Sequence, residues 1–305
     1  MVELSAGGNA LRIAVVGGLT VDRIVLPDGF AKRRMGGGGY YCSVVARELG
    51  NEVTLQTIIG KDFPREWLDQ LEGIGVKVIP EFSDHSIEFV NEYVAQGSRR
   101  QMVLSRPSRG LSKLDKEVIE ADLVQITPVF GELEESAASQ LIKASTSLEV
   151  QGFIRFSDDT RVKKKFWGNR EAWLPRIRFL SLSMDELHCV IRETVLELLE
   201  GFGVETVSLT NGSAGAFVFS REEIYFVPAY PVREADPTGC GDVFSVTLSL
   251  LNARGRTLLD SALIAASASS FIAERGGLDN FPSIEEVESR AEELKKLVRR
   301  AQLGR

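Results

Sequence analysis

The sequence predicts an α/β protein in which helices cover both faces of a mostly parallel sheet. Strand-like apolar runs alternate along the chain with segments of helical spacing, and this alternation is typical of parallel strands joined by crossover helices. Two further segments consist of short strands around turns, which indicates a second, smaller sheet. Because the chain has 305 residues, of which 44% are hydrophobic, it can bury one large core. We therefore expect a single domain over residues 1–305.

The N-terminal elements follow directly from periodicity. Strands are predicted at 13–18 (IAVVGG), 52–60 and 76–79, and helices at 39–50 and 65–75. The strands are short apolar runs, whereas the helices have apolar residues three or four positions apart.

Two inserts, at about residues 20–37 and 86–105, interrupt this alternation. The second alternates apolar and polar residues on both sides of a Gly-Ser pair, a pattern typical of a β-hairpin with one polar face. The first has the same order of short strand, turn and short strand. We expect the two inserts to form a small sheet that stands off the main body.

From residue 122 the α/β alternation resumes. The predicted strands are 122–129, 150–157, 176–183, 204–210, 215–220 and 223–229. The predicted helices are 132–145, 184–203, 240–255, 256–277 and 283–302. Ligands of open α/β sheets bind beyond the carboxyl ends of the strands, so the chemistry is expected in the loops that follow them.

Composition excludes several classes of function. The net charge of −7 argues against a nucleic-acid surface, and no apolar run approaches the roughly 18 residues that span a bilayer. The apolar start has no basic segment before it, so no signal peptide is predicted. Cys42, Cys189 and Cys240 are too widely spaced for a disulfide framework or a zinc site. We expect a cytoplasmic protein that binds neither nucleic acid nor membranes.

Several common catalytic motifs are missing from the sequence. It contains no GxxxxGK[ST], no GxGxxG after a strand, no GxSxG and no HExxH. His85 and His188 are its only histidines, so a Ser-His-Asp triad is disfavoured.

The strongest chemical signal is ADPTGCGD at 235–242, which directly precedes an apolar helix. Gly239 and Gly241 flank Cys240 at the predicted helix start, where free N–H groups and the helix dipole favour an anion. Asp242 is then either a carboxylate that stabilises the first turn or a base beside an anion site. Cys240 is read as a small loop residue rather than as a thiol nucleophile.

A second glycine-rich stretch, MGGGGYYC at 35–42, precedes the predicted helix 39–50. Its glycines let the backbone approach another group closely. From the residues alone, that group is either a ligand or the sheet on which the helix packs, and a flexible turn is also compatible.

With these residues identified, the chain resembles the ribokinase-like sugar kinases of the PfkB family. DPTGCGD is similar to the family motif D-T-x-G-A-G-D, with D-P-T at its start and Cys where Ala is usual. VVGGLTVD at 15–22 resembles the family's first strand and substrate-binding Asp, and GGGGYYC its Gly-Gly motif. The resemblance implies a three-layer α/β/α fold with a mostly parallel central sheet, and a small β-lid formed by the two inserts.

The family transfers the γ-phosphoryl group of ATP, with magnesium, to a hydroxyl group. By resemblance, Asp242 is the general base, and the amides of Gly239, Cys240 and Gly241 form the anion hole. The residues implied to hold the acceptor are Asp22, Gly37, Gly38, Gly39 and Tyr41. Without the resemblance, Asp22 reads equally as an exposed turn residue.

SMDE at 183–186 resembles the family's N-x-x-E, which organises magnesium and phosphates. Ser183 stands where Asn is usual, and Glu186 is the candidate metal ligand. The same four residues also fit a capping box, with Ser183 as N-cap. The remaining nucleotide candidates, against the alternative of an ordinary turn, are Thr210, Gly212, Gly215 and Thr238.

Tyr40 and Tyr41 follow the Gly-Gly motif, where many family members have Asn. This feature, together with VQGFIR at 150–155, resembles a subgroup that includes archaeal inositol kinases. An inositol-like polyol is therefore the favoured acceptor. Arg155 either reaches it or only lies at the end of a strand.

Three alternatives stay open at this point. A nucleoside acceptor would need a flat apolar slot, which Tyr40, Tyr41, Phe89 or Tyr93 could supply. A phosphorylated sugar would need cations such as Arg33, Arg34, Arg99 and Arg100, which otherwise read as solvated turn charges. A non-catalytic ligand-binding or assembly module is disfavoured because Asp242 and both glycines are intact. The family resemblance is also compatible with a homodimer and with a monovalent cation such as K⁺.

Overall fold

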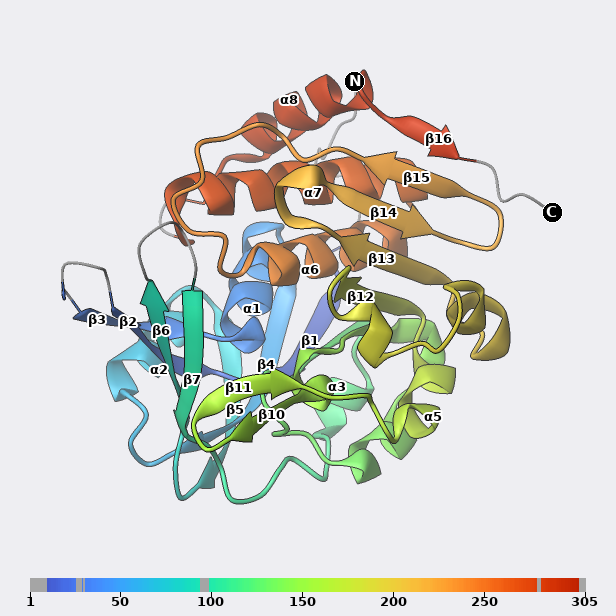
Figure 1. Cartoon of the computed structure of the whole chain (residues 1–305). Coiled ribbons are helices and arrows are strands. Elements are labelled where there is room, and N and C mark those ends of the chain that lie inside the picture. The colour runs from blue at the N-terminus through green and yellow to red at the C-terminus, as the bar shows by residue number, and fades with distance from the viewer. Residues whose placement is uncertain (1–9, 26–28, 30, 94–98, 279–280, 302–305) are drawn as a thin grey trace.

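The computed structural model describes residues 10–25, 29, 31–93, 99–278 and 281–301. Its main element is a ten-stranded sheet flanked by helices, and a second sheet lies beside it (Figure 1). From one edge to the other, the ten strands are β5 (Val76–Ser83), β4 (Glu52–Gly60), β1 (Arg12–Gly17), β8 (Leu123–Thr127), β9 (Thr146–Glu149), β12 (Phe179–Ser183), β13 (Thr206–Thr210), β14 (Ala216–Phe219), β15 (Ile224–Val227) and β16 (Arg299–Ala301). The first seven run parallel, and each of the last three is antiparallel to its neighbour.

Helices cover both faces of this sheet, as the sequence predicts. On β1, Ile13 and Val15 belong to one hydrophobic cluster, while Ala14 and Val16 belong to the other. This alternation is the period of two of a strand buried on both faces. The first cluster includes side chains of α1 (Gly38–Glu48), α2 (Arg65–Gly73), α6 (Cys240–Ala253), α7 (Leu258–Arg275) and α8 (Ile284–Lys295).

The opposite face is covered by short elements. They are α3 (Lys116–Ile119), α4 (Gln151–Ile154), α5 (Arg170–Trp173), the 3₁₀ turns η1 (Glu135–Gln140), η2 (Lys143–Ser145), η3 (Leu174–Arg176) and η4 (Leu187–Cys189), and the π turn η5 (Glu197–Gly201). A further 3₁₀ turn, η6 (Gly212–Ala214), joins β13 to β14. No helix among the described residues is both long and apolar enough to cross a bilayer.

The second sheet has six strands. In order they are β10 (Arg155–Asp158), β11 (Arg161–Lys164), β7 (Arg99–Ser105), β6 (Ile87–Tyr93), β2 (Thr20–Val25) and β3 (Ala31–Gly36). Four of these strands come from the two predicted inserts. The Gly-Ser turn of the second insert lies outside the described residues.

The segment predicted as one strand at 150–157 is instead a helical turn followed by β10. Gly152 explains the turn, because its N–H donates to the carbonyl oxygen of Pro128 at 2.8 Å and an added Cβ would lie 2.5 Å from the Pro128 side chain. The chain therefore leaves the main sheet after β9 and continues as the β10–β11 hairpin of the second sheet. The sequence analysis missed this connection because the apolar run continues through both elements.

Two predicted helices on this face are wrong in extent. At 132–145 the chain forms only 3₁₀ turns, because the backbone around Leu133 hydrogen-bonds with Leu111 across an isolated bridge. At 184–203 the helix is interrupted because the carbonyl of Cys189 accepts from the N–H of Trp167 and the carbonyl of Val190 accepts from Arg170. The predicted helix 283–302 ends at Lys295 and is followed by β16.

Arg170 holds the interrupted segment 184–203 in place. Arg170 is 5% exposed. Its guanidinium donates to the Val190 carbonyl and to Oε1 of Glu197, the latter at 2.6 Å. We predict that Arg170→Ala lowers the free energy of unfolding by about 3 kcal/mol, because it leaves the Val190 carbonyl and the Glu197 carboxylate without this partner. Arg65→Ala removes an exposed pair with Asp69 and should cost less than about 1 kcal/mol. Urea denaturation measures both, and equal losses would contradict the assignment.

Candidate active site

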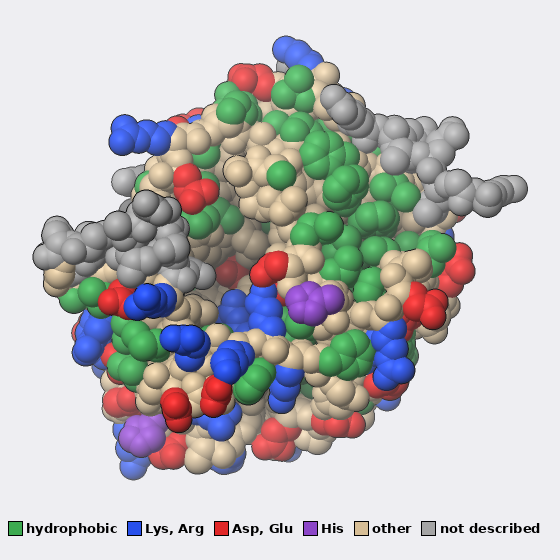
Figure 2. Space-filling model, viewed as in Figure 1, with side chains coloured by type: hydrophobic (Ala, Val, Ile, Leu, Met, Phe, Trp, Pro, Cys, Tyr) green, Lys and Arg blue, Asp and Glu red, His purple; other side chains and the backbone are tan. Residues whose placement is uncertain are grey.

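A large cleft, of about 1530 Å³, lies between the carboxyl ends of the central strands and the second sheet. Figure 2 shows its mouth as a hollow with Lys and Arg side chains along one side. Residues that are far apart in sequence meet there: Asp22 from β2, Ser183 from β12, Thr210 from β13 and Asp242 from α6. This is the edge at which ligands of open α/β sheets bind.

The loop before α6 has the geometry of an anion site. Gly239 is the N-cap in the left-handed region, with φ of 88°, and the dipole of α6 points its positive end at the cleft. The N–H of Cys240 donates to the carbonyl of Pro237 at 3.1 Å. For Gly239 and Gly241 no backbone acceptor occurs within the described residues. Of the three amides predicted for the anion hole, these two are therefore available to a ligand.

Cys240 is held by packing rather than exposed for reaction. Its Sγ donates to the carbonyl of Ser269 at 3.4 Å, and the Ser269 hydroxyl donates back to the Cys240 carbonyl at 3.0 Å. Burial raises the pKa of the Cys240 thiol to about 12, so the thiolate needed for nucleophilic chemistry does not form near neutral pH. This agrees with its reading as a small loop residue that anchors the loop to α7.

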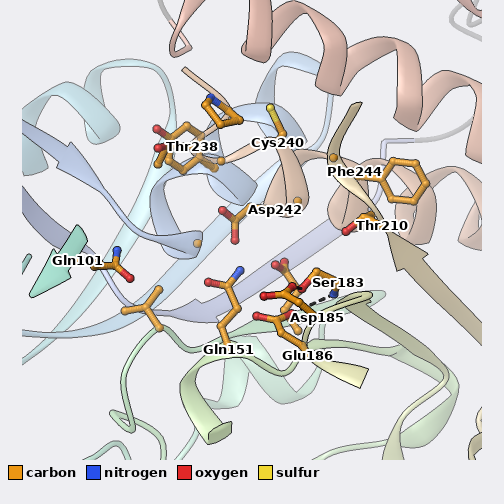
Figure 3. A pocket seen from close by; sticks show the side chains of 18 of the residues that line it. Gln101, Gln151, Ser183, Asp185, Glu186, Thr210, Thr238, Cys240, Asp242 and Phe244 are labelled. Carbon is orange, nitrogen blue, oxygen red and sulfur yellow. Dashed lines mark hydrogen bonds between the residues drawn. The ribbon is translucent and has the colours of Figure 1, made fainter. Parts of the chain in front are cut away.

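Asp242 lies in the first turn of α6 and is 9% exposed. Its carboxyl points into the pocket, with Thr238 and Cys240 on one side and Gln151 on the other (Figure 3). The Thr127 hydroxyl donates to its Oδ1 at 3.5 Å. Burial raises the pKa of Asp242, although a hydrogen bond from Glu149 and the charge of Arg155 partly offset the rise. A base with a raised pKa binds a proton more readily than an ordinary aspartate does.

Glu149 is a site residue that the sequence analysis missed. It ends β9, is 3% exposed and hydrogen-bonds to Asp242. Its Oε1 accepts from the amide of Gln125 at 3.0 Å and from the thiol of Cys42 at 3.6 Å. Burial and the Asp242 charge raise the pKa of Glu149 well above its ordinary value. Two buried carboxyl groups in contact disfavour simultaneous ionisation, so the pair favours a state in which the two groups share one proton.

The acceptor-side candidates come together at the junction of the two sheets. Asp22 is 4% exposed and accepts from the Thr20 hydroxyl at 2.7 Å, so its alternative reading as an exposed turn residue is wrong. Gly37 and Gly38 line the cleft beside it. Gly39 does not line it, because its N–H donates to the carbonyl of Gly18 at 3.1 Å and its backbone packs there. The backbone N–H of Gly39 is therefore engaged in packing, and its contact with the acceptor stays a prediction.

Glycine is required at two of these positions. An added Cβ at Gly38 would lie 1.7 Å from the Thr127 hydroxyl oxygen and 3.0 Å from Oδ1 of Asp242. At Gly239 it would lie 2.3 Å from the ring of Tyr41. Tyr41 is 2% exposed and lines the cleft, and its ring packs against Gly239 of the anion loop.

Arg155 begins β10 rather than ending a strand. It is half-buried and lines the cleft, and its Nη1 donates to the carbonyl of Val129 at 3.5 Å. Its charge acts on Asp242 and lowers the pKa of that carboxyl. On the same face of the hairpin, Lys164 pairs with Asp185 from the loop after β12.

The nucleotide-side candidates lie along the neighbouring strand ends. Parallel register places Ser183 opposite Thr210, and both line the cleft with Thr238. Gly212 and Gly215 also line it. Gly215 has a φ of 110°, and an added Cβ would lie 2.4 Å from the carbonyl of Val227, so it shapes the turn between β13 and β14.

Glu186 satisfies half of the predicted capping box. Its Oε2 accepts from the N–H of Ser183 at 2.9 Å, but the Ser183 hydroxyl donates to Asp185 and only a 3₁₀ turn follows. Glu186 is 6% exposed and lines the cleft. No group of three His, Cys, Asp or Glu residues that could hold a metal occurs in the described part of the chain. One buried carboxylate suits Mg²⁺ that arrives with phosphates, since this ion usually takes one or two carboxylates from the protein.

The carboxyl pair generates a prediction about stability. Because the folded-state pKa of Glu149 is raised, its contribution is complete below the unfolded value of about 4.3 and is lost as pH rises through the folded value. Glu149→Gln should therefore remove at least about 1 kcal/mol of the wild-type decrease in unfolding free energy between pH 5 and pH 8. The measurement is urea denaturation without divalent cations, with the exposed Glu200→Gln as a control that keeps the wild-type slope. Parallel wild-type and Glu149→Gln slopes would show that the pair shares no proton.

Comparison with known proteins gives a consistent set of relatives. The chain is 26% identical over 264 residues to a cytidine kinase of Thermococcus kodakarensis, and this match covers 81% of this chain and 91% of the relative. It is 27% identical over 285 residues to a 2-dehydro-3-deoxygluconokinase of Thermoproteus tenax, with 85% of each chain covered. An inositol 3-kinase of Arabidopsis thaliana is 24% identical over 279 residues, with 88% and 76% covered.

Solved structures share the fold. A nucleoside kinase of Methanocaldococcus jannaschii, described as an archaeal member of the ribokinase family, superposes with a TM-score of 0.75 at 18% identity, covering 94% of this chain and 100% of the other. A pyrophosphate-dependent kinase of the ribokinase family, complexed with myo-inositol and a pyrophosphate analogue, has a TM-score of 0.74 at 20% identity, with 91% and 99% covered. Residues 11–285 match the model described as pfkB family carbohydrate kinase. The chain therefore belongs to the pfkB family of carbohydrate kinases and has the ribokinase fold.

Proposed function

We propose that this kinase transfers the γ-phosphoryl group of ATP to a hydroxyl of a sugar or polyol, with an inositol-like acceptor favoured. The observation that carries the proposal is the position of Asp242. Its buried carboxyl lies beside the amides of Gly239 and Gly241 and faces the same cleft as Asp22 of the second sheet. A base next to an anion site is the arrangement that phosphoryl transfer requires.

In the proposed reaction, Asp242 accepts the proton of the acceptor hydroxyl as the oxygen attacks the γ-phosphorus. The bond between that phosphorus and the β–γ bridging oxygen breaks, and ADP leaves. The N–H groups of the loop and the positive end of α6 stabilise the charge on the transferred group. Glu149 keeps its proton and orients Asp242 through their hydrogen bond.

The donor side of the proposal uses Thr210, Gly212, Gly215, Thr238 and Ser183, all of which line the cleft. Glu186 would hold Mg²⁺ there, and the bound ion would neutralise phosphate charge. ATP is the proposed donor. Because kinases of this fold include pyrophosphate-dependent ones, pyrophosphate is the alternative donor to be tested.

The acceptor half of the cleft supports a polyol. Polar side chains that can hydrogen-bond to hydroxyl groups line it, namely Thr20, Asp22, Gln101, Gln151 and Arg155. The aromatic residues suited to a base are already used in packing. Tyr41 supports Gly239, and Phe89 is 3% exposed with its ring edge-on to Phe130 at 5.9 Å. The side chain of Tyr93 lies outside the described residues.

A nucleoside is the second candidate acceptor. It is favoured by the similarity to a cytidine kinase and by Phe89 and Met102, which line the cleft and could border a base. A phosphorylated sugar has less support, because Arg34 pairs with Asp236 at 2.7 Å and Arg100 lies 3.9 Å from Glu92.

Three further expectations remain proposals. We expect the second sheet to act as the lid of a single kinase domain, because Asp22 and Arg155 reach the cleft from it. A homodimer through this sheet is to be tested by sedimentation. A cytoplasmic location is supported by the three cysteines, which are all free.

An ADP-release screen tests the acceptor. We expect inositols to give a higher kcat/KM than hexoses, ribose or nucleosides, because hydrogen-bonding side chains line the acceptor half of the cleft. The screen uses ATP and Mg²⁺, and each positive is repeated with pyrophosphate as donor. A nucleoside as the best acceptor would establish the second candidate in place of the first.

Asp242→Asn tests the base. This variant keeps the shape of the side chain but cannot accept the proton, so kcat should fall by about 10²–10⁴-fold, while calorimetry shows that acceptor binding is retained. Cys240→Ala is the matched control from the same turn and should keep kcat within a few-fold. Wild-type turnover in Asp242→Asn would refute the assignment, and loss of turnover in Cys240→Ala alone would favour a thiol mechanism.

A further inference from the structure

Arg34 lies outside the cleft lining but holds the anion loop from behind. It extends from β3, and its Nη2 donates to Oδ2 of Asp236 at 2.7 Å while its Nη1 donates to the carbonyl of Gly276 at 3.2 Å. The side chains of Arg34 and Asp236 are 19% and 13% exposed. One guanidinium thus joins the second sheet, the first residue of the loop 236–241 and the C-cap of α7.

Asp236 transmits this contact to the loop. Its Oδ1 accepts from the N–H of Thr238 at 2.9 Å, and its own N–H donates to the carbonyl of Ala273 at 3.3 Å. Burial acts to raise the pKa of Asp236, but the hydrogen bonds from Thr238 and the Arg34 charge outweigh it and hold the pKa below its ordinary value. The carboxylate is therefore charged and bound on both sides, which fixes the path of the chain into Gly239.

Arg34 is also coupled to the acceptor side. In the antiparallel pair β2–β3 it lies directly opposite Asp22, and partners of this kind project to the same face of a sheet. The acceptor-side carboxylate and the anchor of the anion loop are therefore neighbours on one rigid strand pair. A shift of the second sheet would move both together.

The monovalent cation implied by the family resemblance does not fit this loop. A cation that ordered it would need oxygen ligands beside it. Asp236 supplies the carboxylate at the start of the loop and Gly276 a carbonyl facing it, and both already accept from Arg34. The guanidinium therefore supplies the positive charge at these two oxygens.

We propose that Arg34 is the resident cation of the anion loop, a positioning residue that makes phosphoryl transfer independent of monovalent cations. The inference rests on the proposed kinase function. The amides of Gly239 and Gly241 can stabilise a phosphoryl group only if they are held in place, because preorganised donors lower the barrier without reorganising during the reaction. Arg34 supplies that order through Asp236.

The test compares wild type, Arg34→Ala, Arg34→Lys and, as control, Arg33→Ala, which removes an exposed charge from the same strand. Turnover is measured in choline, sodium, potassium, ammonium and low guanidinium chloride at constant ionic strength. Wild type and Arg33→Ala should show the same kcat in all salts within two-fold. Arg34→Ala should lose about 10–100-fold in kcat, less than the roughly 10²–10³-fold that removal of an anion-hole donor costs, because the amides are misplaced rather than removed, with KM for the acceptor little changed. Guanidinium or ammonium should restore part of the rate, and Arg34→Lys should be intermediate.

A second readout does not depend on activity. Hydrogen exchange of amides 235–241 in the ligand-free protein should be faster in Arg34→Ala than in wild type or Arg33→Ala. If Arg34→Ala does not fold, Asp236→Asn removes the charge of the partner and should show the same faster exchange. A wild-type requirement for potassium, or unchanged exchange and kcat in Arg34→Ala, would overturn the proposal. Faster exchange in a protein without kinase activity would instead refute the proposed function and leave the structural role of Arg34 standing.

Discussion

The cleft depends on how closely the glycine backbone at the start of α1 approaches the end of β8 and the first turn of α6. At Gly38 there is no room for even one carbon atom, because Thr127 and Asp242 occupy the space in which a Cβ would lie. This approach joins β3 of the second sheet to the central sheet and sets the candidate acceptor residues against the candidate base. Glycine meets the constraint at the cost of backbone entropy on folding, which the buried helices α1 and α6 offset.

Charge burial is the second constraint on this site. Asp242 and Glu149 are two carboxyl groups in contact within a buried region, and both could not be ionised there without a large penalty. The raised pKa of Glu149 favours its protonated form, and Gln125 and Cys42 donate to its Oε1. Arg155 lies close enough to favour the ionised form of Asp242. The pKa of the candidate base, Asp242, is thus set by its surroundings rather than by its own sequence motif.

The sequence predicts the parts of the fold that rest on local signals. Strand β1 and helices α1, α6 and α7 follow from periodicity, and ADPTGCGD marks the turn into α6. The segment 184–203 fails because its helical pattern is overridden by a distant side chain, Arg170, which takes a backbone carbonyl that the helix would need. Sequence patterns within the segment 184–203 cannot predict this contact, because Arg170 lies outside the segment.

The same distinction applies to the site. Asp242, Asp22 and the loop glycines could be proposed from the sequence because their motifs are contiguous. Glu149 and the contact of Arg34 with the loop could not, because their partners lie far along the chain. Arg34 is separated from Asp236 by 202 positions. Glu149 precedes the VQGFIR segment by one residue, so its position directly before a predicted site segment was the one available signal.

The most direct test of the central claim is a crystal structure with ADP, Mg²⁺, aluminium fluoride as a mimic of the transferred phosphoryl group, and the acceptor selected by the screen. The account predicts that the fluoride ligands lie within hydrogen-bonding distance of the Gly239 and Gly241 amides. It also predicts an acceptor oxygen that contacts the Asp242 carboxyl, in line with the aluminium. Nucleotide bound elsewhere, or an acceptor whose nearest carboxylate is not Asp242, would contradict it.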